Sequence, residues 1–254
     1  MIHTRNFEEA DFLLCATKNG VVKKTKLGEY NTPLKADGII AIKMREGDEL
    51  VAVRHCSPGD DILLVSRKGQ AIRFNEQAAR AMGRATEGVR GMTLRAGDEV
   101  IAAEIAHPDA DLLVVTENGF GKRTRVSEYP AKGRGGMGVL TVKLTEARGY
   151  LVGARVVRDG YQMMLISTGG TMIKMPVEDV KRLGRSTQGV IVMRLREGET
   201  VSSLAPVIDS GDENEDAPAP GEPSVEMDDS FVEEPEDDDV ELDDPDEAPD
   251  EEEE

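Results

Sequence analysis

Residues 111–120, DLLVVTENGF, are one of four versions of a pattern that returns about every fifty residues. The other versions are DFLLCATKNG at 11–20, DILLVSRKGQ at 61–70 and YQMMLISTGG at 161–170. The second halves of the units also agree, and each opens with a glycine: Gly38, Gly88, Gly138 and Gly189. Self-similarity at a fixed period of this length predicts a repeat architecture.

The first half of each unit is typical of a β-hairpin. In the first unit, strands predicted at Leu13–Thr17 and Val21–Lys26 flank Asn19-Gly20, a favoured two-residue turn. The later units keep a glycine at this turn. The second half of the unit predicts two more strands, near Ile39–Met44 and Glu49–Arg54.

Four short strands per unit, with no helical stripe beyond a short stretch near Asn75–Ala81, are typical of a β-propeller. A stack of parallel β-helix coils would repeat at a much shorter interval. We therefore predict an all-β fold, a propeller-like or pinwheel-like array of four four-stranded blades over residues 1–208. The units run over about 11–60, 61–110, 111–160 and 161–208, and residues 1–10 align with the end of a preceding blade.

The charge divides the chain into two parts. The 254 residues carry a net charge of −19, but 25 of the 50 acidic residues lie in 209–254, which has no Lys or Arg. The first 208 residues hold 31 Lys and Arg against 25 Asp and Glu, a net charge of +6. The acidic segment has one aromatic residue, Phe231, and too little apolar surface to offset the cost of ordering it. We expect a basic domain followed by a disordered acidic tail.

The remaining composition argues for a cytosolic protein with no membrane partner. No apolar run approaches the ~18 residues that cross a bilayer, and the start of the chain lacks the apolar region of a signal peptide. Cys15 and Cys56 are too few for a disulfide framework, which suits a reducing compartment.

Residues typical of catalysis are scattered. The three histidines do not share a repeat position, and none forms a metal-ligand spacing with another His or Cys. Asp11, Asp61 and Asp111 each open a strand, so neighbours are separated by a whole blade and cannot form a catalytic pair. We expect no catalytic residue, no metal site and no cofactor in this chain.

Residues 132–138, KGRGGMG, contain the spacing G-x-G-x-x-G of a dinucleotide-binding turn. Such a turn must open a helix, whereas this stretch precedes a predicted strand. The other repeats give a better comparison, because GRATEG at 83–88 and GRSTQG at 184–189 stand at the same place. A bend favours glycine but does not require arginine, so the recurrent arginine is the functional signal. The candidate phosphate-binding residues of these three G-R loops are Arg84, Lys132, Gly133, Arg134, Gly135, Gly136, Gly138 and Arg185.

A second basic position lies four residues after each hairpin glycine and never turns acidic: Lys24, Arg73, Arg123 and Lys174. Neighbouring cations extend it in two units: Lys23, Lys26, Lys122 and Arg125. The plain alternative is a solvated strand face, but such a face usually mixes both signs of charge. We predict a discontinuous basic belt around the rim of the blades.

A belt of this kind fits the regularly spaced phosphates of double-stranded DNA, which Lys and Arg bind without reading sequence. Single-stranded nucleic acid would call for aromatic stacking platforms. Aromatic residues make up only 4% of the chain, and none recurs beside the basic positions. Double-stranded DNA is therefore the expected partner. The alternative is a propeller scaffold for protein partners, in which the basic loops are ordinary surface.

The fifty-residue units, the opening DLLVVTENGFGKRT and the KGRGGMG loop together resemble the C-terminal domain of DNA gyrase A, of the actinobacterial type. The resemblance covers about 1–208. It implies a β-pinwheel whose rim wraps DNA, so that the holoenzyme introduces negative supercoils using ATP. It also implies the rest of gyrase A and the gyrase B protein as partners, and places ATP and magnesium elsewhere in the holoenzyme. The C-terminal domain of the corresponding topoisomerase IV protein is the alternative.

Two departures from this family matter. Met137 stands where the family loop usually has a lysine, which removes one expected phosphate contact. Only four of the family's six blades are present, and the strand-cleavage domain with its catalytic tyrosine is not found in this sequence. Since the first residues also align with the middle of a strand, we interpret the chain as a fragment, or an internally initiated product, of a gyrase A protein. One hypothesis for its acidic tail is contact with the basic belt in competition with DNA, and the alternative is a disordered end that only adds solubility.

Overall fold

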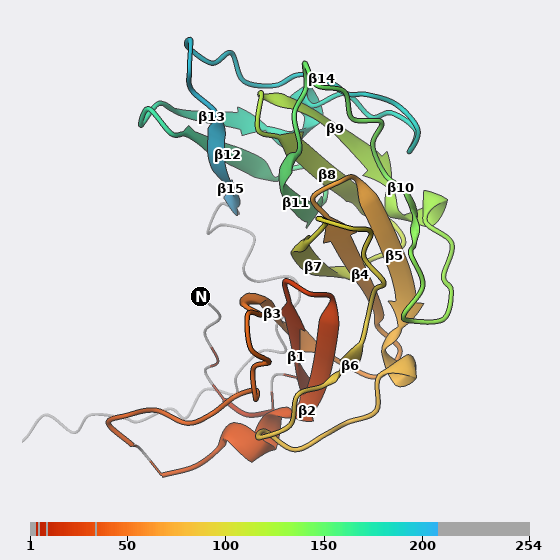
Figure 1. Cartoon of the computed structure of the whole chain (residues 1–254), viewed down its shortest axis with the longest axis vertical. Coiled ribbons are helices and arrows are strands. Elements are labelled where there is room, and N and C mark those ends of the chain that lie inside the picture. The colour runs from red at the N-terminus through yellow and green to blue at the C-terminus, as the bar shows by residue number, and fades with distance from the viewer. Residues whose placement is uncertain (1–3, 5, 9, 34, 208–254) are drawn as a thin grey trace, which may run out of the picture. The chain divides into compact units, whose positions relative to one another are not determined.

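The computed structural model describes residues 4, 6–8, 10–33 and 35–207, and the predicted acidic tail lies outside these residues. The described residues form four antiparallel sheets that follow one another in chain order (Figure 1). The prediction of an all-β, propeller-like fold with four blades is confirmed.

Each sheet is built around one of the predicted hairpins. The first has the order β3-β1-β2-β6, with β1 at Phe12–Thr17, β2 at Val21–Lys26, β3 at Leu50–Cys56 and β6 at Val89–Arg90. The second has the order β10-β5-β4-β7, with β4 at Asp61–Ser66, β5 at Gln70–Asn75, β7 at Val100–Ala106 and β10 at Val139–Leu140. The third has the order β11-β8-β9-β14, with β8 at Asp111–Thr116, β9 at Phe120–Arg125, β11 at Leu151–Val157 and β14 at Val190–Ile191. The fourth has the order β13-β12-β15, with β12 at Gln162–Ser167, β13 at Met172–Pro176 and β15 at Val201–Val207.

The fourth strand of each complete sheet comes from the next repeat, which the sequence did not reveal. Strand β6 belongs by sequence to the second repeat, yet it pairs with β2 of the first, with Val22 opposite Val89. Gly88 makes this crossing possible, because its φ is +94° and an added Cβ would lie 2.5 Å from the Val22 carbonyl oxygen. Strands β10 and β14 repeat the arrangement on β5 and β9.

The predicted strand at Ile39–Met44 is wrong, since the structure has no strand there. Its counterparts are strands of two residues that exist only through their pairing with the preceding repeat. The first repeat has no preceding hairpin within the described part of the chain. The fourth sheet has three strands, because the described part of the chain contains no later repeat that could supply a fourth.

The predicted helical stretch near Asn75–Ala81 is a single 3-10 turn, η2, at Glu76–Ala78. The Asn75 side chain caps it by accepting a hydrogen bond from the backbone N–H of Gln77, and Ala79 is already extended. The other repeats have the same turn after their second strand: η1 at Leu27–Tyr30, η3 at Val126–Glu128 and η4 at Val177–Asp179.

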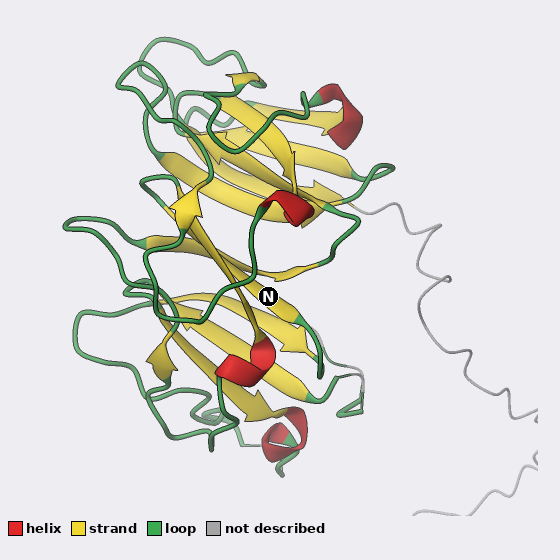
Figure 2. Ribbon diagram, turned by 90° about the vertical axis from the view of Figure 1, so that its right-hand side faces the viewer, coloured by secondary structure: helices red, strands yellow, loops and turns green. Residues whose placement is uncertain are grey.

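The sheets are stacked one on another in the side view of Figure 2. The hydrophobic core lies mainly between successive sheets. Adjacent residues of a strand point to opposite faces. Leu64 of β4 therefore joins a cluster with Leu14 of the first sheet, whereas Leu63 joins one with Leu112 of the third. Burying such a leucine contributes roughly 1.5–3 kcal/mol, so both faces of each inner blade stabilise the array.

An ion network joins strands β3, β7 and β11. The Glu104 carboxylate accepts hydrogen bonds from Arg54 Nη2 at 2.6 Å and Arg155 Nη1 at 2.9 Å. Glu104 is almost completely buried, so its charge depends on these two partners. The network fixes three neighbouring blades to one another.

Candidate nucleic-acid interface

The three G-R loops run across the second hairpin strand of the preceding repeat. In the first of them, Met82 N–H donates to the Lys24 carbonyl at 2.8 Å, and Lys132 N–H repeats this bond to Arg73 at 2.9 Å. In the third loop, Leu183 N–H donates to the Arg123 carbonyl at 2.8 Å. Each loop is therefore held by its backbone at a junction between two blades.

The predicted exposure of Lys23 and Lys122 is wrong, because both side chains are completely buried beneath these loops. Lys23 Nζ donates to the Ala41 carbonyl at 2.6 Å and to the Arg84 carbonyl. Lys122 Nζ donates to the Gly184 and Arg185 carbonyls at 2.6 and 2.7 Å. Burial lowers the pKa of both ammonium groups, that of Lys122 to about 8. Their charge is directed to loop carbonyls instead of to solvent.

The second basic position also points inward in three repeats. Lys24 is buried, forms an ion pair with the Glu76 carboxylate and donates to the Glu76 carbonyl at 3.1 Å. Arg73 contacts Asp61 at 2.8 Å and the carbonyls of Val126 and Tyr129 at 3.3 Å. These carbonyls belong to, or directly follow, the 3-10 turn of the next repeat.

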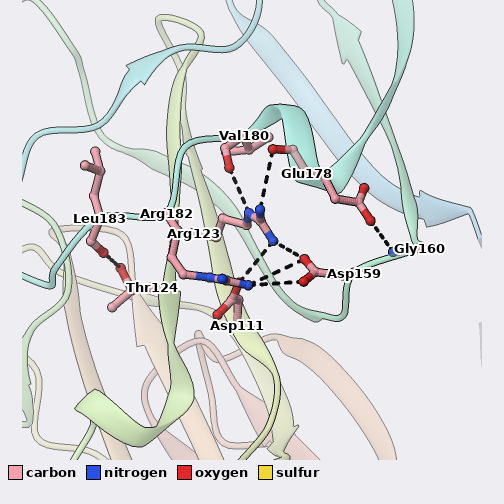
Figure 3. Close-up of polar contacts among 9 residues, drawn as sticks. All are labelled: Asp111, Arg123, Thr124, Asp159, Gly160, Glu178, Val180, Arg182 and Leu183. Atoms are coloured by element: carbon pink, nitrogen blue, oxygen red, sulfur yellow. Dashed lines mark hydrogen bonds and ion pairs between the residues drawn. The ribbon is translucent and has the colours of Figure 1, made fainter.

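Arg123 makes the most complete version of this junction, as Figure 3 shows. Its guanidinium donates to the Val180 carbonyl at 2.8 Å, the Glu178 carbonyl at 3.4 Å and the Asp111 carboxylate at 3.2 Å. It also pairs with Asp159. Carbonyls at the end of a helical turn attract a cation. The predicted exposed belt is therefore wrong at Lys24, Arg73 and Arg123, and the junction explains why this position is never acidic.

The other predicted residues remain accessible. Side chains of Lys26, Arg125, Lys132, Arg134 and Lys174 are exposed, and those of Arg84 and Arg185 are half-buried. Lys174 stands at the junction position of the fourth repeat, where the described residues include no later turn for it to bind.

The loop at 132–138 is fastened by its own arginine. Arg134 Nε donates to the Ala78 carbonyl at 2.6 Å and Nη1 to the Arg90 carbonyl at 2.9 Å, and Nη2 makes no hydrogen bond within the described residues. Thr93 adds bonds from its hydroxyl to the Gly135 carbonyl at 2.6 Å and from its N–H to the Gly136 carbonyl at 2.9 Å. The structure thus brings Lys132, Arg134 and the glycines together on one anchored loop.

Gly138 ends this loop in a conformation that other residues rarely adopt. Its φ is +76°, and an added Cβ would lie 2.3 Å from the Ala71 carbonyl oxygen. Met137, beside it, is 51% exposed. The loop therefore presents an apolar side chain where its tip turns into strand β10.

Sequence reasoning missed a further set of exposed cations that flank the loops. Lys43 and Lys143 are exposed, and their backbone N–H groups donate to the carbonyls of Thr86 and Thr187 at 3.0 and 2.9 Å. Thr93 and Arg194 stand at the same repeat position. The spacing of fifty residues, with a cation in three of four units, was the signal that could have identified them.

The loops offer a ligand positive charges that are held in place and a glycine-rich backbone that the ligand can approach closely. Among residues 4–207, leaving aside the undescribed positions, no group of His, Cys, Asp and Glu side chains could hold a metal ion. In the same part of the chain, no helix has the length and apolar character needed to span a membrane.

Comparison with known proteins gives one consistent family. The family described as DNA gyrase C-terminal domain, beta-propeller, matches residues 11–57, 60–107, 110–158 and 162–208. The DNA gyrase A protein of Mycobacterium tuberculosis is 43% identical over 217 residues, which cover 84% of this chain and 26% of that protein. The chain thus spans about a quarter of the length of the curated relatives it matches.

Two solved structures share the fold. A DNA gyrase A C-terminal domain superposes with a TM-score of 0.73 at 25% identity, covering 81% of this chain and 68% of that one. The C-terminal domain of DNA topoisomerase IV superposes with a TM-score of 0.75 at 26% identity, covering 82% and 65%.

Proposed function

The chain belongs to the DNA gyrase C-terminal domain family, and from this premise we propose that residues 1–208 bind double-stranded DNA through its backbone and wrap it. Binding of this kind neutralises phosphates and reads no sequence. The domain performs no catalysis itself. It supports ATP-dependent negative supercoiling by the gyrase holoenzyme, as part of gyrase A working with gyrase B in the bacterial cytoplasm at the nucleoid. ATP and magnesium belong to other parts of that holoenzyme.

The observation that carries this proposal is the recurrence of an anchored, arginine-bearing loop at three successive blade junctions. Arg84, Arg134 and Arg185 occupy equivalent positions, and the backbone of each loop is hydrogen-bonded to the preceding repeat. A rigid array of this kind holds cations at regular intervals, and a duplex presents phosphates at regular intervals. A duplex whose phosphates contact the loops of successive blades must bend, and wrapping requires such a bend.

A role in topoisomerase IV is the second candidate, because the C-terminal domain of that enzyme superposes as well as that of gyrase does. The curated relatives with 43% identity are gyrase A proteins, and this favours gyrase.

We further propose that the acidic segment 209–254 competes with DNA for the basic residues of the domain. This rests on charge alone, 25 carboxylates in the segment against a net charge of +6 in 1–208. A flexible tether gives an effective concentration near ~1 mM, whereas non-specific DNA binding has a Kd of roughly 10⁻⁴–10⁻⁶ M.

Ligation of nicked circular plasmid on the protein tests the wrapping proposal. Wrapping shifts the topoisomer distribution in proportion to the protein added. A triple variant with alanine at Arg84, Arg134 and Arg185 loses the shift, whereas a control that removes three charges outside the loops retains it. The control positions are Lys68, Arg95 and Arg158. A distribution that stays centred with the unaltered chain refutes wrapping and supports the scaffold alternative.

A further inference from the structure

The buried ammonium group of Lys122 meets its hydrogen-bonding capacity with atoms of a single loop. It donates to the Gly184 carbonyl at 2.6 Å, the Arg185 carbonyl at 2.7 Å and the Thr187 hydroxyl at 3.1 Å. A lysine ammonium has three N–H donors, so three donors meet three acceptors. The loop belongs to the fourth repeat and the lysine to the third, so the contact crosses a blade junction.

Lys23 repeats this contact about one hundred residues earlier in the sequence. Its Nζ donates to the Arg84 carbonyl in the loop of the second repeat and to the Ala41 carbonyl at 2.6 Å. Thr86 and Thr187 close their loops alike, each hydroxyl donating to the carbonyl of the loop's first glycine at 2.8 Å. The two loops are therefore held by equivalent lysine and threonine contacts.

The intervening repeat has no lysine at this position. Ile72 stands there, and its Cδ1 lies 3.6 Å from the place where a Cβ on Gly136 would be. Gly136 also replaces the threonine that closes the other two loops. In this loop Arg134 supplies the anchor instead, through two bonds to backbone carbonyls.

We propose that Lys122 and Lys23 are positioning residues, which fix the loops 184–189 and 83–88 from beneath so that Arg185 and Arg84 are free to meet the DNA backbone. The inference rests on the proposed function, since DNA is the ligand of these loops. The Arg185 guanidinium keeps one long hydrogen bond, 3.4 Å from Nη1 to the Leu140 carbonyl. No hydrogen bond from the Arg84 guanidinium occurs among the described residues. In the loop 132–138, by contrast, Nε and Nη1 of Arg134 are already used to anchor the loop.

Both ammonium groups are desolvated where they lie. Burial lowers the pKa of Lys122 to about 8, opposed by the Glu128 carboxylate and reinforced by the Arg185 guanidinium. The groups acting on Lys23 are Cys15, Glu29 and Arg84.

Lys122→Met tests the inference, because methionine fills a similar volume and Ile72 shows that the fold accepts an apolar residue at this position. Lys68→Met is the matched control, since Lys68 binds the Ala96 carbonyl at 2.7 Å outside the G-R loops and carries the same charge. Thr187→Val is a milder second variant that removes one acceptor. Each is studied in the full chain by amide hydrogen exchange and by binding to a fluorescent duplex at about pH 7.

We expect Lys122→Met to lose amide protection in 184–189 only, and to bind duplex roughly tenfold more weakly near neutral pH, the usual size of one lost charge-assisted hydrogen bond. Arg185→Ala added to Lys122→Met causes little further loss, because both changes remove the same contact.

Unchanged protection and unchanged affinity in Lys122→Met overturn the inference, as does an equal loss in Lys68→Met. Full additivity with Arg185→Ala also overturns it, because Lys122 would then act on DNA independently. Failure of the unaltered chain to bind duplex refutes the proposed function. In that case the exchange measurement still decides whether Lys122 sets the shape of the loop.

Discussion

Arg123 and Asp111 lie on paired strands with Nη1 of the arginine 3.2 Å from Oδ2 of the aspartate, and both side chains are buried. The same carboxylate oxygen accepts a hydrogen bond from Arg182 Nε of the next repeat at 2.8 Å. One carboxylate thus holds two cations across a blade junction. This arrangement turns what looked like a DNA-binding position into an internal one.

Arg123→Ala is expected to lower the free energy of unfolding by about 3–5 kcal/mol, because it leaves Asp111 buried with less compensation. Arg125→Ala is the control, since Arg125 is exposed on the same strand. It should change stability by less than about 0.5 kcal/mol. Urea denaturation of the full chain measures both, and similar losses in the two variants would contradict the assignment.

Arg134→Ala is expected to reduce wrapping more than Arg84→Ala. Arg134 both anchors its loop through the Ala78 and Arg90 carbonyls and is exposed, whereas the half-buried Arg84 guanidinium makes no hydrogen bond within the described residues. The topoisomer shift after plasmid ligation measures wrapping, and circular dichroism verifies the fold. An equal or smaller effect of Arg134→Ala would refute a special role for the 132–138 loop.

Gly138→Ala is expected to destabilise the domain by at least roughly 1–3 kcal/mol, from the positive φ and from the clash with the Ala71 carbonyl. Gly133→Ala in the same loop serves as the comparison. An added Cβ there meets nothing within 4 Å, and its φ is not in the left-handed region. Thermal unfolding of both variants gives the difference, which would vanish if strand β10 could shift without cost.

Stability is expected to rise with pH between about 8 and 10.5 through Lys122. Its pKa is lowered to about 8 in the folded chain from 10.5, so in this window the unfolded chain binds more protons than the folded one. Opposing contributions come from Cys56 and Tyr129, whose pKa values burial raises to about 12. Urea titrations of the unaltered chain and of Lys122→Met isolate the lysine, since the other groups are common to both. Parallel pH curves would show that Lys122 is not shifted.

Removal of 209–254 is expected to tighten duplex binding, most strongly at low salt, because an intramolecular competitor of opposite charge is lost. Fluorescence anisotropy over a range of salt concentrations follows the change. Affinity and salt dependence identical to those of the full chain would eliminate competition by the acidic segment.

The hairpins and the four-bladed class could be predicted because they depend on local signals, alternating apolar residues and a glycine at each turn. The strand exchange could not, because a pair as short as Val89–Arg90 is a strand only when β2 lies beside it. Its partner lies in the preceding repeat, far away in the sequence, and no local propensity reports such a pairing.

Only part of the candidate site could be predicted, for a related reason. The G-R loops could be found because glycine and arginine recur at a fixed spacing in segments without other structure. Lys23 and Lys122 were misplaced because a lysine on a strand normally faces solvent. Nothing in the sequence of one repeat shows that the carbonyls of the next repeat lie above it.

The donation of a strand from each repeat to the one before has a consequence for how such a protein can grow or shrink. The sequence repeat and the sheet therefore have different boundaries, because each complete sheet takes one strand from the next repeat. A unit excised along its sequence borders would carry three strands of its own sheet and a two-residue hook for a missing neighbour. Grafting one complete blade onto another scaffold therefore carries the hairpin of the next repeat with it, because β4 and β5 lie between β3 and β6 in the chain.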